Sequence, residues 1–270
     1  MQDQHFSLWL RRPERDGHRK DPVDTGVIDF AAWVMALLAT RKSTAKPVLR
    51  TDLLDAFRIA AIEEADDAME AFLRDLVRQK VSAATVADLY IPALARRLGD
   101  DWLDDRVSFM QVTLASSRMQ GMLRAIGAAW TADLADPAQQ GALLLIVVPN
   151  EQHTLGAMVL QGQLRRMGIS VRLCVAPEPF ELRGILTGGH YQGVLISASS
   201  PLRLADLRSM VEEVRRTGPD GLVVAVGGHI LQAEVDVKGA TGADLATSDP
   251  MLVLEACGIR CEAAGVRQRA

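Results

Sequence analysis

The sequence predicts an α/β protein in which an N-terminal helical bundle is followed by a doubly wound parallel sheet. Three observations support this fold class. Apolar residues recur every three or four positions up to about residue 130, as in amphipathic helices. The run ALLLIVVP at 142–149 breaks that period and is typical of a strand that is covered on both faces. Strand-like and helix-like segments then alternate, which favours parallel strands joined by crossover helices.

The helical half divides into an arm and a bundle. Residues 1–25 are polar and contain prolines, so they predict a mobile N-terminal arm. The bundle is expected over residues 26–131. Its helices are expected at 27–42, 53–80, 82–102 and 107–130.

The ends of two of these helices can be assigned from capping residues. Either Thr51 or Asp52 is expected to cap the helix at 53–80. Ser82 is expected to cap the next helix, and Gly99 to end it.

The sheet domain is expected over residues 141–262, after the linker TADLADPAQQG. Its strands are expected at 142–149, 169–175, 191–199 and 221–228. Helices are expected at 153–168, 179–189 and 201–218, with shorter elements at 242–249 and 250–258. Ligands of such sheets bind outside the carboxyl ends of the strands.

Composition narrows the class of protein. A hydrophobic content of 49% is ample for a folded core. We expect a cytoplasmic protein, because no apolar run approaches the roughly 18 residues of a membrane span and the N-terminus lacks a signal-peptide core. A net charge of -4 argues against nonspecific attraction to nucleic acid. Cys174, Cys257 and Cys261 form no CxxC pair, which suits a reducing compartment, although Cys257 and Cys261 leave a metal or redox pair as an alternative.

Residues with distinctive chemistry gather at the expected carboxyl ends of the strands. They are Glu151, His153 and Gly156 after the first strand, Ser197 and Ser199 after the third, and Gly227 and Gly228 after the fourth. A parallel sheet brings these turns to one crevice. Small residues there suggest that a flat, bulky ligand lies close to the sheet.

These three turns together resemble the cobalamin-binding signature, in which Asp-x-His-x-x-Gly precedes Ser-x-Leu and Gly-Gly. The counterparts here are Glu151, His153, Thr154, Leu155 and Gly156, then Ser197 and Ser199, then Gly227 and Gly228. The resemblance implies a Rossmann-like, flavodoxin-like cobalamin-binding domain. It also implies that these residues border cobalamin (adenosylcobalamin or hydroxocobalamin), with His153 as the lower ligand of the cobalt. An imidazole suits that role because its second nitrogen can bond to a carboxylate, for which Glu151 is the candidate.

Two residues depart from the signature. Glu151 replaces aspartate, so its hydrogen bond to His153 is either reoriented or lost, and Ser199 replaces leucine, which makes the slot for the cofactor tail more polar. His229, next to the double glycine, is either a competing ligand or a loop residue.

The segment at 90–124 resembles the helical cap that covers the upper face of the corrinoid in methionine synthase and in light-responsive cobalamin regulators. Trp102 stands where those regulators carry a tryptophan that shields the upper axial group; packing within the bundle is the alternative. Repressors of the CarH type have Glu-His at the positions of Val112 and Thr113, so no upper histidine adduct is expected from this helix.

The run EQHTLGA, the cap and the chain length are similar to the AerR/PpaA family of photosynthesis regulators. This resemblance implies a non-enzymatic photoreceptor that controls transcription as an antirepressor, with a repressor of the CrtJ/PpsR type as its partner. No membrane partner and no direct DNA contact without the repressor are expected. Heme, which related domains bind, is an alternative cofactor. A corrinoid carrier of a methyltransferase system and an interaction module without cofactor are alternative functions.

Overall fold

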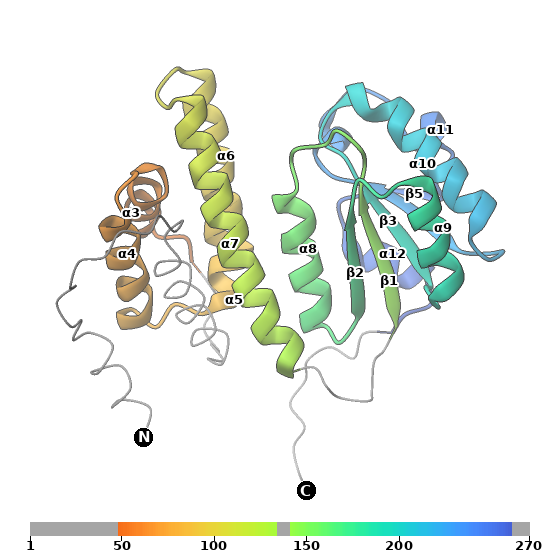
Figure 1. The fold of residues 1–270 in the computed structure, drawn as a ribbon, viewed down its shortest axis with the longest axis horizontal. Coiled ribbons are helices and arrows are strands. Elements are labelled where there is room, and N and C mark those ends of the chain that lie inside the picture. The colour runs from red at the N-terminus through yellow and green to blue at the C-terminus, as the bar shows by residue number, and fades with distance from the viewer. Residues whose placement is uncertain (1–47, 134–140, 261–270) are drawn as a thin grey trace, which may run out of the picture.

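The computed structural model describes residues 48–133 and 141–260. The arm expected at 1–25, the helix expected at 27–42 and Cys261 lie outside these residues. Figure 1 shows a helical bundle beside a sheet domain, with α7 of the bundle lying along α8 of the sheet domain. No described helix combines the length and the apolar character that a membrane crossing needs.

The helical bundle is built from the elements that precede the sheet. They are α3 (Thr51–Ile62), α4 (Asp66–Arg78), α5 (Ala83–Thr85), the π-helical turn η1 (Val86–Tyr90), α6 (Ile91–Leu103) and α7 (Phe109–Asp133). Their shared core contains Phe57, Phe72, Leu94 and Met119, all at most 2% exposed. Ser82 caps α5 as predicted, because its side chain accepts a hydrogen bond from the Thr85 N–H.

The single helix predicted at 53–80 is wrong, because the chain turns back on itself between α3 and α4. Glu63 and Ala65 have extended backbone angles. The guanidinium of Arg118 on α7 donates to the carbonyl oxygen atoms of Ala60 and Ala61 at the end of α3. The turn lets Phe57 stack on Phe72 with ring centroids 4.5 Å apart.

Two predicted helix ends are also wrong. Arg50 is the N-cap of α3 and makes no side-chain capping bond, so neither Thr51 nor Asp52 has that role. Helix α6 continues past Gly99 to Leu103, because the backbone there stays helical and Asp101 is held from both sides by arginines.

The sheet is parallel, with strand order β2-β1-β3-β4-β5. Its strands are β1 (Ala142–Val147), β2 (Ser170–Val175), β3 (Gly193–Ser197), β4 (Val223–Gly227) and β5 (Leu245–Ala246). The connecting elements are α8 (Leu155–Arg166), α9 (Pro179–Gly188), η2 (Pro201–Arg203), α10 (Leu204–Thr217), η3 (His229–Gln232), α11 (Val237–Thr241) and α12 (Pro250–Ala256). This order confirms the doubly wound, flavodoxin-like prediction.

Alternate residues of each strand face opposite cores. Leu144 and Ile146 of β1 belong to the core beneath α9 and α10, whereas Leu143 and Leu145 belong to the core beneath α8 and α12. Because β1 is covered on both faces, its sequence is apolar throughout.

Helix α8 packs against both cores. Ala157 and Leu164 belong to the sheet core, whereas Leu155, Met158 and Val159 pack against the core of the bundle. The helix that follows the predicted histidine turn therefore joins the two halves of the molecule.

Candidate functional site: the histidine turn at the end of β1

The backbone conformation of Asn150 and a backbone hydrogen bond shape the turn between β1 and α8. Asn150 has a φ of 60°, in the left-handed region that asparagine tolerates. The Glu151 N–H donates to the carbonyl of Val148 at 3.3 Å. The chain thus reverses immediately after the strand, and the Glu151 side chain enters the interior with only 3% of its surface exposed.

Glu151 accepts four hydrogen bonds. Its Oε1 atom lies 2.8 Å from both the backbone N and the Nδ1 of His153. Its Oε2 atom lies 2.7 Å from both the backbone N and the Oγ of Ser199, which follows β3. One carboxylate therefore joins the turn after β1 to the turn after β3. The hydrogen bond between Glu151 and His153 is not lost on replacement of aspartate by glutamate.

These bonds decide the charge of the carboxyl group. Burial alone raises the pKa of Glu151, but the donors on His153 and Ser199 outweigh it and lower the pKa to about 2. Glu151 is consequently ionised at neutral pH, and it favours the His153 tautomer with its proton on Nδ1.

His153 is oriented at one nitrogen and open at the other. Its Nδ1 lies 2.8 Å from Glu151 Oε1 and 3.0 Å from Ser199 Oγ, while 77% of the side chain is exposed. The tautomer with its proton on Nδ1 leaves the Nε2 lone pair available to a metal ion.

The small residues expected around the site have different surroundings. A Cβ atom at Gly156 would meet no atom within 4 Å, so the space beside it is open. Gly228 has a φ of 103°, and a Cβ atom there would lie 2.3 Å from the Ala198 carbonyl oxygen. Gly228 thus permits close contact between the turns after β3 and β4, and its predicted place beside the ligand stays a prediction. Ser197 is half-buried and pairs with Gly227 across these strands.

Thr154 and Leu155 contact the bundle. Thr154 Oγ1 accepts a hydrogen bond from Gln120 Nε2 on α7 at 3.0 Å, and Leu155 packs against the bundle core. The residues directly after His153 thus connect the turn to the bundle.

Trp102 is 52% exposed near the end of α6. The neighbouring Asp101 is buried and pairs with Arg58 at 2.5 Å and with Arg106 at 2.8 Å, which fixes this end of the bundle. Phe109 at the start of α7 is 73% exposed. Figure 1 places the connection between α6 and α7 at the same end of the molecule as the carboxyl ends of the strands.

Two other candidate ligands from the sequence are His229 and Cys257. His229 is exposed on η3. Cys257 is half-buried, and burial raises the pKa of its thiol to about 11, so it is protonated at neutral pH. Among residues 48–133 and 141–260, no group of three or more His, Cys, Asp or Glu side chains is placed to hold a metal ion.

One curated relative is similar to this chain over most of the relative's length. The two are 38% identical over 174 residues, which cover 64% of this chain and 91% of the relative. The relative is described as an uncharacterized 20.5 kDa protein in the bchF-crtJ intergenic region of Rhodobacter capsulatus. The chain belongs to the family of this protein. No family model matches the sequence.

Solved structures place this family in a known fold. The monomethylamine corrinoid protein of Methanosarcina barkeri superposes with a TM-score of 0.59 at 13% identity, covering 78% of this chain and 98% of that protein. For a cobalamin-binding protein from Desulfitobacterium hafniense, the alignment covers the same shares of the two chains at 16% identity, with a TM-score of 0.39. The first superposition shows a shared fold with a sheet and accompanying helices.

Sequence reasoning missed two contacts of this site. It placed Ser199 beside the cofactor but did not predict the hydrogen bond from its hydroxyl to Glu151, 48 residues away in the sequence. No motif in the sequence indicates a role for Gln120, because only the packing of α7 on α8 brings its side chain to Thr154. Glu151 and Ser199, the two departures from the signature, are partners of each other.

Proposed function

We propose that the chain is a cobalamin-binding, light-responsive regulator of the AerR/PpaA type, which acts as an antirepressor through a repressor of the CrtJ/PpsR type. The observation that carries the proposal is His153, with Nδ1 held by an ionised, buried carboxylate and Nε2 open at the strand ends. This is the arrangement expected of a lower ligand to cobalt. A family member encoded between bchF and crtJ supports the regulatory part.

The described residues fit a corrinoid at this position. A single imidazole would suffice to hold the metal ion, because the macrocycle itself would supply most of the other ligands. Open space beside Gly156 and exposed apolar side chains at the same end of the molecule, among them Trp102 and Leu202, suit a large, partly apolar ligand. Of the two cofactors expected from the sequence, only the corrinoid gains support from the shared fold.

The proposed response runs from the turn to the bundle. An alkylcobalamin supplies a cobalt–carbon bond that light can break. His153 would hold this cofactor, and a shift of its turn would reach α7 through the hydrogen bond between Thr154 and Gln120. The exposed surface of the bundle would then differ between dark and light. A partner with different affinities for the two surfaces would bind more in one state than in the other.

A corrinoid carrier function is the second candidate, because the structure with the same fold is a corrinoid protein named for monomethylamine. Like the regulator, a carrier is not itself an enzyme. Dark and illuminated protein should bind the repressor differently if the chain is a regulator, and equally if it is a carrier.

Absorption spectra test the site. Purified protein is mixed with adenosylcobalamin, hydroxocobalamin or heme and recorded in the dark and after illumination. We expect retained corrinoid with a light-dependent spectrum, and loss of the histidine-ligated spectrum in His153→Ala. His229→Ala, on the neighbouring turn, is the matched control and should leave the spectrum unchanged. A spectrum that depends on His229 instead of His153 would reassign the ligand, and a Soret band without retained corrinoid would contradict the proposed cofactor.

The proposed coupling has its own variant. Gln120→Ala removes the donor to Thr154 but leaves His153 and Glu151 untouched. We expect it to bind cobalamin like the natural protein while reducing the difference in repressor affinity between dark and light. An unchanged difference would show that the response does not pass through this hydrogen bond.

A further inference from the structure

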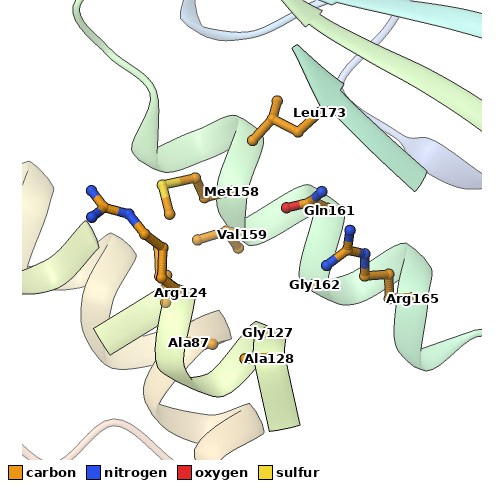
Figure 2. Close-up of a pocket in the computed structure, with 11 residues that line it drawn as sticks. Ala87, Arg124, Gly127, Ala128, Met158, Val159, Gln161, Gly162, Arg165 and Leu173 are labelled. Carbon is orange, nitrogen blue, oxygen red and sulfur yellow. The ribbon is translucent and has the colours of Figure 1, made fainter. Parts of the chain in front are cut away.

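A cavity of about 410 Å³ lies between α7 and α8 (Figure 2). Its apolar wall is formed by Leu123 on α7, Met158 and Val159 on α8, and Leu173 on β2. The volume is within the roughly 300–1,000 Å³ typical of small-molecule sites. The cavity runs along α8 towards Arg165 in its last turn, whereas His153 precedes the other end of the same helix. It is therefore a separate place from the histidine turn.

The polar side chains that line the cavity are all able to donate hydrogen bonds. They are Arg124 from α7, and Gln161 and Arg165 from α8 (Figure 2). Gln161 Nε2 and Arg165 Nη2 both donate to the carbonyl oxygen of Val171, at 3.3 and 3.0 Å. No Asp or Glu is among the described residues that line the cavity. Burial lowers the pKa of Arg165, so its positive charge is incompletely solvated.

We propose that this cavity binds an amphipathic anion: a short alkyl chain with a carboxylate or phosphate head group. The head group is placed at Arg165, because a guanidinium presents parallel N–H donors to the oxygen atoms of either group. The chain lies against Leu123, Met158 and Val159. Bound between the two helices, the ligand contacts the bundle and the sheet domain together. The proposal does not depend on what His153 binds.

Methionine methyl groups provide the first test. Full-length protein labelled at the methionine methyls is titrated with octanoate, with octyl phosphate and with neutral 1-octanol. We expect the Met158 signal to shift saturably with at least one of the two anions, and the signal of Met110, which is 69% exposed on the bundle, to stay fixed. The two anions distinguish the head groups. No saturable shift with either anion, or an equal shift with 1-octanol, would overturn the proposal.

Two glycines on α7 offer a matched pair of variants. A Cβ atom at Gly127 or at Gly121 would meet no atom within 4 Å, but only Gly127 lines the cavity. Gly127→Leu fills the cavity and should abolish anion binding, whereas Gly121→Leu should retain it. Arg165→Gln should weaken binding about tenfold or more, because it removes a charged hydrogen-bond donor. Unchanged affinity in Gly127→Leu would place the ligand elsewhere and refute the assignment.

Discussion

Glu151 keeps its negative charge in a buried position because four donors from two turns surround it. An unpaired carboxylate would otherwise take up a proton on burial. The same four contacts fix the orientation of His153 and join the turns after β1 and β3. Glu151 thus stabilises this edge of the sheet and also fixes the orientation of His153, the proposed ligand of the cobalt.

The depressed pKa of Glu151 makes stability dependent on pH. A carboxyl whose pKa is about 2 in the folded protein and about 4.3 when unfolded contributes stability above pH 4.3, and this is lost as the pH falls towards 2. Because solvent screens part of these interactions, the contribution at neutral pH is at most about 3 kcal/mol. Urea unfolding of the natural protein and of Glu151→Gln between pH 6 and pH 2 should show a difference in free energy that shrinks with acidification. Parallel curves would contradict the prediction.

The Ser199 hydroxyl donates to a charged acceptor. Ser199→Ala should therefore lower the free energy of unfolding by about 1.5–3 kcal/mol, measured by urea denaturation. Ser209→Ala, at an exposed position on α10, is the control and should change it by less than about 0.5 kcal/mol. Equal effects of the two substitutions would show that the hydroxyl does not stabilise Glu151.

Among the elements, the turns that follow β3 and β4 lie against each other, and Gly228 makes this contact possible. Gly228→Ala should cost at least about 1–2 kcal/mol, because the left-handed backbone is strained by a Cβ atom that also meets the Ala198 carbonyl. Gly156→Ala is the matched control, since its Cβ atom would enter open space. Thermal unfolding of the two variants measures the difference, and similar midpoints would argue against it.

Elements were predictable from the sequence where local pattern decides them. The central strands β1, β3 and β4 read as apolar runs because they are covered on both faces, whereas the edge strand β2 carries the exposed Arg172. The amphipathic period of α7 follows from one buried face. The break between α3 and α4 was not predictable, since the capping guanidinium of Arg118 lies 58 residues from Ala60. In the site, the strand ends supplied His153 and Glu151 as candidates. The role of Ser199 was not predictable, because the spacing of the serines after β3 does not show which hydroxyl faces Glu151.

At the scale of the whole molecule, α8 packs on the bundle core and the sheet core, so the two halves should unfold together. Buried methionines report on each half: Met119 lies in the bundle core and Met210 in the sheet core. Their methyl signals should disappear at the same urea concentration. Met158→Ala should lower the free energy of unfolding reported by both signals by the same amount, about 1–2 kcal/mol, whereas Met251→Ala on the surface of α12 should leave both nearly unchanged. Two separate midpoints would refute this shared cooperativity.

Helix α8 also has a geometric consequence. Its 12 residues form a rod about 18 Å long, with the histidine turn at one end and Arg165 near the other. A rod that tilts at one end must move at the other, so ligands at its two ends have a common mechanical element. Thermodynamic reciprocity then requires each ligand to change the affinity for the other by the same factor. Titrations at the cavity with and without corrinoid thus measure, without light or a repressor, how strongly the two ends of α8 are coupled.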